Sequence, residues 1–340
     1  MRFTVVGAGA IGGTLGAYMV RGGEAVEFAD RAADHVAAMR SMGLTIKAFD
    51  GTFNVPVNAA TIGELKGPLD VVLLAVKAQD TEGAVKAIRP LLDTRSAVVS
   101  LQNGLCEPII AALIGAEKTI GAFINFNADY LEPGTIHFGG PGAFYVGEID
   151  GSTSPRVGEM VRRFSHWGTV RSTVNIFGYL WSKLGYANML YATALVDEPM
   201  ADVVDAHRRL MVELSCEVYD VAEAENIHLE PFDNVEPNLY FPREDQDWEA
   251  INRSLDSLVG LMRQSEKQKT GVWRDLAVRK RKTEVDYHLG AAAAVGRRHG
   301  LDMPLTHRLI EMIHEVEDSH RTMAWANVEE LDALFVRQGV

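Results

Sequence analysis

The N-terminal stretch constrains the possible folds of this chain more than any other. Phe3 to Val6 is a β-rich run that predicts a buried strand, and Thr14 to Val20 has helical spacing. Between them lie Gly7, Gly9 and Gly12 in the pattern GxGxxG. The first glycine allows a tight turn, the second lets the backbone approach a phosphate, and the third lets the helix pack close to the strand. This order predicts a dinucleotide site, with the pyrophosphate at the helix N-terminus. The predicted contacts are Gly7, Ala8, Gly9, Ala10, Ile11 and Gly12.

The composition narrows the class of protein. With 340 residues, the chain has room for two domains of roughly 100–200 residues each. Its formal net charge of −13 argues against a nucleic-acid-binding surface. No apolar run approaches the ~20 residues that a membrane span needs, and two cysteines make no disulfide framework. We therefore expect a cytoplasmic protein that binds neither nucleic acid nor membranes, and we predict no metal site.

Two adjacent residues bear on the choice of nucleotide. Ala25 to Asp30 predicts a second strand, and Asp30 stands where a carboxylate accepts hydrogen bonds from the ribose hydroxyls of NAD. Arg31 follows directly, and an arginine there can hold the 2′-phosphate of NADP. Alternatively, Asp30 caps the helix expected from Ala33. The balance slightly favours NADP over NAD.

Two further polar residues follow predicted central strands. Lys77 comes directly after the apolar run Leu69 to Val76, and Asn103 follows the run Ala97 to Leu101. Open α/β sheets bind ligands at the carboxyl ends of their strands, so we expect both side chains near the nucleotide. Each could instead be an ordinary polar residue of a loop.

The second half of the chain has a different periodicity. After about Val174, apolar residues recur at intervals of three or four residues. This spacing predicts helices near 177–196, 203–226, 247–268, 283–299 and 305–318. The stretch Glu230 to Asp247 is polar, and we expect an exposed loop there. The fold class is therefore an α/β Rossmann-type dinucleotide-binding domain, residues 1–172, followed by an all-α domain, residues 173–340.

A series of short motifs, taken in order, resembles the ketopantoate reductase (2-dehydropantoate 2-reductase) family over nearly the whole chain. The motifs are Gly7-Ala-Gly-Ala-Ile-Gly12, Ala75-Val-Lys77, Gln102-Asn-Gly104, Pro133-Gly-Thr-Ile, Leu180-Trp-Ser-Lys183-Leu184, Thr283-Glu284-Val-Asp286 and Gly300-Leu-x-x-Pro304. The resemblance implies an NADPH-dependent reductase of small 2-oxo acids in pantothenate biosynthesis. It also implies an active site between the two domains and a homodimer formed through the helical domain.

The resemblance also assigns roles to individual residues. Lys183 would be the general acid, because an ammonium can stabilise and protonate the keto oxygen as it gains charge. Glu284 would orient Lys183 or hold a substrate hydroxyl. Without the resemblance, Lys183 would be interpreted as a solvated helix lysine and Glu284 as an acid at a helix start. The predicted substrate-binding residues are Lys77, Asn103, Lys183, Asn188, Thr270 and Glu284.

The sequence departs from the family where the substrate would be recognised. The family places asparagines four and eight residues after its lysine, but here these positions are Ala187 and Tyr191. Asn188 is the nearest amide, about 100° further round a helix than Ala187. Thr270 is the hydroxyl nearest to the position of the family's serine.

These departures leave alternatives open beside the reduction of 2-dehydropantoate or a close analogue. One is an NAD-dependent D-2-hydroxy acid dehydrogenase with a bulkier substrate, which Asp30, Tyr191 and Trp273 would suit. Another is a non-catalytic nucleotide-binding protein, against which the presence of Lys183 and Glu284 argues.

Overall fold

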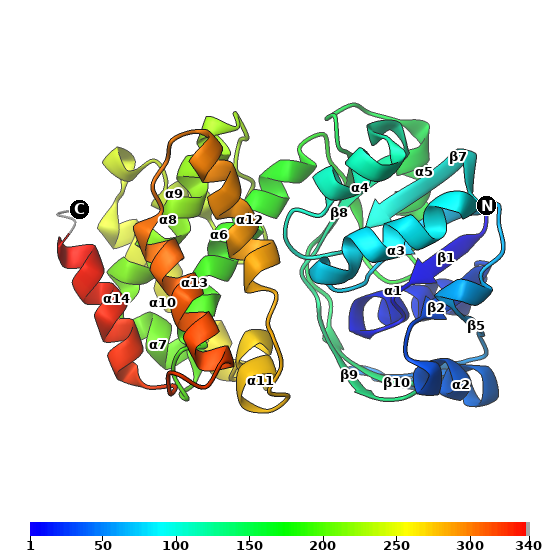
Figure 1. Cartoon of the computed structure of the whole chain (residues 1–340), viewed down its shortest axis with the longest axis horizontal. Helices are drawn as coiled ribbons and strands as arrows, with labels where there is room; N and C mark the ends of the chain where they lie inside the picture. The colour runs from blue at the N-terminus through cyan, green and yellow to red at the C-terminus, as the bar shows by residue number, and fades with distance from the viewer. Residues whose placement is uncertain (338–340) are drawn as a thin grey trace. The chain divides into compact units, whose positions relative to one another are not determined.

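The structure, a computed structural model, describes residues 1–337 and comprises two units (Figure 1). Met1–Ile176 form an α/β unit and Phe177–Val340 a helical unit. The division falls at residue 176, where 172 was expected. Ile176 explains the shift: it is buried, and it lies so close to Gly121 and Gly147 that a Cβ at either glycine would press on its side chain.

The main sheet of the α/β unit has eight strands in the order β12-β11-β8-β7-β6-β1-β2-β5. Their bounds are β1 (Phe3–Val6), β2 (Val26–Asp30), β5 (Asn58–Thr61), β6 (Leu69–Leu74), β7 (Leu92–Ser100), β8 (Thr119–Ile124), β11 (Phe144–Glu148) and β12 (Arg171–Ser172). The six strands from β8 to β5 in this order run parallel, and β11 is antiparallel to β8. This confirms the predicted Rossmann-type class.

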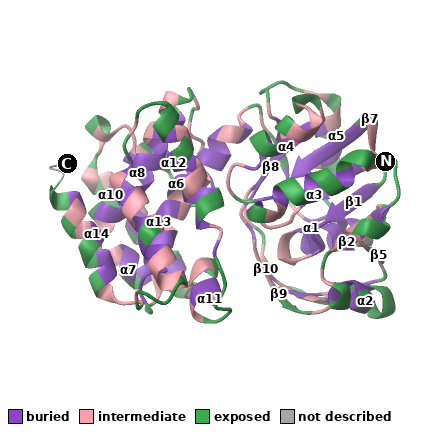
Figure 2. Cartoon of the chain, in the orientation of Figure 1, coloured by how far each residue is buried: buried purple, intermediate pink, exposed green. Residues whose placement is uncertain are grey.

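Helices cover both faces of this sheet, which is why its central strands are apolar throughout. α1 (Ala10–Arg21), α2 (Ala33–Met42) and α5 (Pro155–Phe164) contribute to the core on one face. α3 (Thr81–Ile88) and α4 (Glu107–Ile114) contribute to the core on the other. Figure 2 shows buried residues along β1 and β7 and exposed residues on α2 and α3.

A second sheet, with strands in the order β4-β3-β10-β9, packs against α1. Its strands are β3 (Leu44–Ala48), β4 (Gly51–Val55), β9 (Asn127–Glu132) and β10 (Thr135–Gly140). β3 and β4 form an antiparallel hairpin across a turn at Phe49 and Asp50. α1 touches both sheets, and its glycines make this possible: a Cβ at Gly16 would lie 2.5 Å from the ring of Phe28, and one at Gly13 would collide with Ile136.

The second unit is helical, as predicted (Figures 1 and 2), and α8 (Arg208–Ala224) is largely buried and packs against several of its other helices. Its helices are α6 (Ile176–Thr193), α7 (Met200–Ala206), α8 (Arg208–Ala224), α9 (Pro237–Tyr240), α10 (Trp248–Gln264), α11 (Gly271–Ala277), α12 (Val285–Arg298), α13 (Pro304–Glu317) and α14 (Trp325–Arg337). All five predicted segments are largely helical, although 203–226 is interrupted at His207. Within residues 1–337, no helix is both long enough and apolar enough to cross a membrane.

The stretch Glu230 to Asp247 corrects the expectation of an exposed loop. Phe232 and Tyr240 are buried, and α9 forms within the stretch. Arg243 anchors it to α8 through ion pairs of 2.6 Å with Glu213 and 2.6 Å with Asp220. The polar composition therefore reflects pairing with α8 as well as contact with solvent.

Candidate active site

The glycine loop after β1 has the geometry of a dinucleotide site. Gly7 has a φ of +95°, and a Cβ there would lie 2.7 Å from the backbone of Ala75. A Cβ at Gly12 would lie 2.8 Å from the Ala75 Cβ and would also collide with the Gly7 carbonyl oxygen. At Gly9, by contrast, no described atom lies within 4 Å of where a Cβ would stand. The fold therefore forbids side chains at the first and third glycines and leaves open space above the second.

The start of α1 fits an anionic ligand beside this open space. Among the described residues, no side chain caps the N-terminus of α1, and the first turn of this helix contains no acidic residue. Its N-terminal N–H groups and dipole are therefore available to a pyrophosphate. Ala10 and Ile11 are partly exposed there, whereas Ala8 is buried and its N–H donates to Asp30.

Asp30 braces the glycine loop. One carboxylate oxygen accepts from the N–H of Ala8 at 2.9 Å, and the other accepts from the N–H of Ala32 at 2.9 Å. Each oxygen retains a lone pair that could take a ribose hydroxyl. Arg31 is 74% exposed and pairs with Asp80 at 2.9 Å. This exposed guanidinium, next to the end of β2, could reach a 2′-phosphate.

His35 also holds the loop, although nothing in the sequence marked it. It is buried, its Nδ1 accepts from the N–H of Gly134 at 2.9 Å, and its Nε2 lies 2.8 Å from the carbonyl oxygen of Ala8. Because Nδ1 accepts, Nε2 carries the hydrogen and donates to that carbonyl. The partners are far apart in sequence, so only the folded chain shows this link between α2, the loop and the second sheet.

The ends of β6 and β7 meet the same edge of the sheet as the glycine loop. In the parallel register, Leu74 pairs with Val6 on β1 and with Ser100 on β7. Lys77 and the exposed Asn103 therefore lie at the carboxyl edge, as the sequence predicted.

Gln102 ties these two strand ends together. Its Nε2 donates to the Val76 carbonyl oxygen and to Thr81 Oγ1, both at 2.8 Å. The link fixes the loop after β6 relative to the loop after β7, so the backbones that carry Lys77 and Asn103 are held in place.

Lys183 lies on α6 of the helical unit, and its environment lowers its pKa to about 8. Burial is the main cause, because it disfavours the charged ammonium. Asp233 raises the pKa and Lys267 lowers it. An amine shifted toward neutrality suits a general acid. Sequence reasoning missed Asp233 and Lys267, since neither belongs to a motif.

Glu284 precedes α12, and its neighbours fix the backbone there. The N–H and hydroxyl of Thr283 donate to one oxygen of Glu317, at 2.7 and 2.8 Å. The Glu284 side chain is largely buried, and its Oε1 lies 3.9 Å from Nε2 of His288, one helical turn later. His288 Nδ1 in turn lies 3.1 Å from the hydroxyl of Tyr191 on α6.

Asn188 does not occupy the predicted position. It is 0% exposed, and its Nδ2 donates to the Leu214 carbonyl oxygen at 2.6 Å and to Thr306 Oγ1 at 2.7 Å. The 100° offset from Ala187 turns the amide into the core of the helical unit, so this geometry gives no support to a substrate contact. Thr270 is also buried, and its hydroxyl accepts from the N–H of Trp273 at 3.1 Å as the cap of α11.

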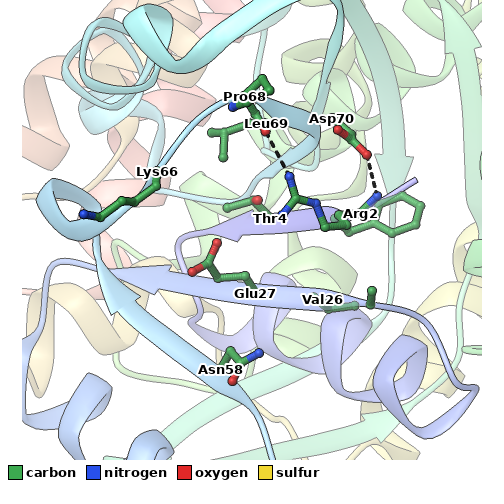
Figure 3. Close-up of a pocket in the computed structure, with 11 residues that line it drawn as sticks. Arg2, Thr4, Val26, Glu27, Asn58, Lys66, Pro68, Leu69 and Asp70 are labelled. Atoms are coloured by element: carbon green, nitrogen blue, oxygen red, sulfur yellow. Dashed lines mark hydrogen bonds between the residues drawn. The ribbon is translucent and has the colours of Figure 1, made fainter.

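A cavity of about 230 Å³ in the α/β unit lies elsewhere (Figure 3). Its lining includes Arg2 and Thr4 at the start of β1, and Leu69 and Asp70 at the start of β6. These are the amino ends of the strands, opposite to the glycine loop, so the cavity is separate from the candidate nucleotide site. Among residues 1–337, no group of three or more His, Cys, Asp or Glu side chains is placed to hold a metal ion.

Comparisons with known proteins agree with this architecture. The family model of ketopantoate reductase PanE/ApbA matches residues 3–151, and the model of its C-terminal part matches residues 175–317. The 2-dehydropantoate 2-reductase of Lactococcus lactis is 24% identical in an alignment of 337 residues that covers 94% of this chain and 98% of the relative.

Solved structures resemble the chain over most of its length. The 2-dehydropantoate 2-reductase of Geobacter metallireducens GS-15 has a TM-score of 0.79 at 26% identity, over 93% of this chain and 99% of that chain. A D-mandelate dehydrogenase solved with NADH and anilino(oxo)acetate has a TM-score of 0.79 at 21% identity, over 94% and 99%, a likeness of fold. Because the two family models together match most of the chain, the chain belongs to the ketopantoate reductase family, whose members are oxidoreductases acting on a CH–OH group.

Proposed function

We propose that this protein reduces a 2-oxo acid to a 2-hydroxy acid with a nicotinamide nucleotide, and that the substrate is 2-dehydropantoate or a close analogue. The observation that carries the proposal is Lys183, whose pKa lies near 8 in a chain that also has an open glycine loop. Relatives named 2-dehydropantoate 2-reductase support the substrate class.

In this mechanism the nicotinamide nucleotide, when bound, supplies the hydride. Lys183 donates a hydrogen bond to the keto oxygen and transfers its proton as that oxygen gains charge. Asp233 and Lys267 oppose each other in setting the acidity of this ammonium. Glu284 accepts a hydrogen bond from a substrate hydroxyl, and Lys77 and Asn103 bind near the nicotinamide and the substrate.

We propose NADPH as the preferred nucleotide. The exposed Arg31 supports this, because a guanidinium binds a phosphate with bidentate hydrogen bonds. Both carboxylate oxygens of Asp30 already accept hydrogen bonds from backbone N–H groups. These hydrogen bonds weaken the repulsion between the carboxylate and a 2′-phosphate.

A second candidate is an NAD-dependent D-2-hydroxy acid dehydrogenase with a bulkier substrate. Ala187 and Tyr191 at the positions of the family's amides favour it, and the fold resembles that of a D-mandelate dehydrogenase. Benzoylformate, the 2-oxo acid of mandelate, would then be reduced better than 2-dehydropantoate.

The test is steady-state reduction of 2-dehydropantoate and of benzoylformate, each with NADPH and with NADH. We expect the highest kcat/KM for the pair of 2-dehydropantoate and NADPH. In Arg31→Ala the advantage of NADPH should fall about tenfold, which corresponds to one charge-assisted hydrogen bond of about 1.4 kcal/mol. A preference for benzoylformate with NADH would establish the second candidate, and absence of turnover with both acids would overturn the proposal.

We also propose that the protein acts as a cytoplasmic homodimer. Two buried cysteines without a disulfide suit a reducing compartment, and family resemblance supports the dimer. Light scattering of the purified protein tests the assembly; a monomer at working concentrations would contradict it.

A further inference from the structure

Three polar side chains from two helices meet inside the helical unit. Tyr191 comes from α6, and Glu284 and His288 come from the start of α12, four residues apart. The Tyr191 hydroxyl lies 3.1 Å from His288 Nδ1, and His288 Nε2 lies 3.9 Å from Glu284 Oε1. Tyr191 is only 3% exposed, and His288 is also buried. Phenol, imidazole and carboxylate thus form a chain in which each group faces the next.

The surroundings set the direction of the hydrogen bond between the phenol and the imidazole. Burial and the negative charge of Glu284 raise the pKa of Tyr191 well above its usual 10, so the phenol keeps its proton. The Nε2 side of the imidazole faces the Glu284 carboxylate, which favours a hydrogen on that nitrogen. The phenol then donates to Nδ1, and the Nε2 hydrogen points toward Glu284.

The place of this chain of groups in the unit gives it a functional meaning. Tyr191 follows Lys183 by eight residues on the same helix, which brings it back to within about 80° of the same face. Ala187 lies between them and offers only a methyl group, and Asn188 is used in the core. On this part of α6 no described amide is available for a substrate hydroxyl, which leaves Glu284 as the candidate for that recognition in the helical unit.

We propose that Tyr191 and His288 are positioning residues, which hold the Glu284 carboxylate in one orientation so that it accepts a hydrogen bond from a hydroxyl on the side chain of the 2-oxo acid. The inference rests on the proposed function, because it assumes that Glu284 meets the substrate. It assigns the substrate to the hydroxylated 2-oxo acids. It also gives Tyr191 a role through its hydroxyl group, not through the bulk of its ring.

The chain of three groups, in which Tyr191 is hydrogen-bonded to His288 and His288 lies 3.9 Å from Glu284, can be tested without any substrate. In protein labelled with ¹⁵N-histidine, His288 should show the neutral Nε2–H tautomer. Tyr191→Phe and Glu284→Gln should each shift its ring nitrogen resonances. Tyr240→Phe is the matched control, since Tyr240 is equally buried in the same unit and its hydroxyl is hydrogen-bonded to Ser254 on α10. A His288 spectrum that is unchanged in Tyr191→Phe, or unchanged in Glu284→Gln, overturns the inference.

The effect on specificity is tested with 2-dehydropantoate and its deoxy analogue, 3,3-dimethyl-2-oxobutanoate. The ratio of their kcat/KM values should fall about tenfold in Tyr191→Phe, the size expected for one misplaced charge-assisted hydrogen bond. The ratio should not change in Tyr240→Phe, and NADPH affinity and Tm should be alike in the two variants. In a Glu284→Gln background, Tyr191→Phe should have no further effect on the ratio.

Additive effects of these two substitutions, or an unchanged ratio in Tyr191→Phe, would overturn the positioning role. If the wild-type protein reduces neither acid, the proposed function fails, whereas the His288 spectra still decide whether the three side chains act together. The two failures are therefore distinguishable.

Discussion

The two units carry their functional groups in different ways. In the α/β unit, Gly7, Gly9 and Gly12 build the nucleotide loop within six consecutive residues, and each works through its backbone. In the helical unit, Lys183 on α6 and Glu284 directly before α12 are about 100 residues apart in sequence, and each would act through its side chain. A site made of backbone is encoded locally, whereas a site made of side chains depends on which helices pack together.

The sharpest test of the helical unit is removal of the ammonium. Lys183→Ala should slow turnover of the 2-oxo acid by about 10³-fold, because a general acid contributes roughly 10²–10⁴ and its charge also stabilises the oxyanion. Nucleotide affinity, measured by fluorescence titration, should not change. Lys86→Ala, at an exposed lysine of α3, is the control. Turnover within tenfold of wild type would contradict the role of Lys183.

The corresponding test of the α/β unit compares two of its glycines. Gly9→Ala meets no described atom, so stability should be retained while the methyl group fills the space for the pyrophosphate. We expect nucleotide affinity to fall about 10–100-fold, or ~1.4–2.7 kcal/mol.

Gly12→Ala should instead lower Tm, since its Cβ would strike Val5 and Ala75 at 2.8 Å. Gly83→Ala, on α3 with open space, should be neutral or stabilising. If Gly9→Ala bound nucleotide as tightly as wild type, the loop would not be the pyrophosphate site.

The environment of Lys183 predicts the pH dependence of reduction. The acid form must be protonated, and its pKa is about 8, so kcat/KM should fall as the pH rises above 8. Lys267→Met removes a cation that lowers this pKa, so the descending limb should move to higher pH. Asp233→Asn removes an anion that raises it, so the limb should move to lower pH. Identical limbs in both variants would show that another group controls the profile.

The contrast between the units also explains what could be predicted from the sequence. The strands, the glycine loop and the positions of Lys77 and Asn103 follow from local pattern and from the parallel register of β1, β6 and β7. β9 is harder to recognise in the sequence, because its side chains are at most partly buried and do not alternate clearly. Family resemblance, and no local pattern, pointed to Lys183 and Glu284.

Local sequence patterns could not predict contacts between residues that are far apart in the chain. His35 meets Gly134 at a separation of 99 residues, and Tyr191 meets His288 at a separation of 97. Phe232 and Arg243 show the same limit, since the polar composition around them gave no sign that Phe232 is buried or that Arg243 pairs with Glu213 on α8. A side chain's partner is a property of the fold, so its role appears only once the helices are placed.

Asn188 gives the smallest expected effect on catalysis and separates structure from function most directly. Asn188→Ala removes two buried hydrogen bonds and leaves the Leu214 carbonyl oxygen without the amide that donates to it. The free energy of unfolding should fall by about 1–3 kcal/mol, the range for an unsatisfied buried group. KM for the 2-oxo acid and the turnover rate should stay within twofold of wild type, because the amide faces the core. A tenfold rise in KM at unchanged Tm would mean that the amide turns toward the substrate when it binds, and the family's amide recognition would then persist here from a position one residue further along α6.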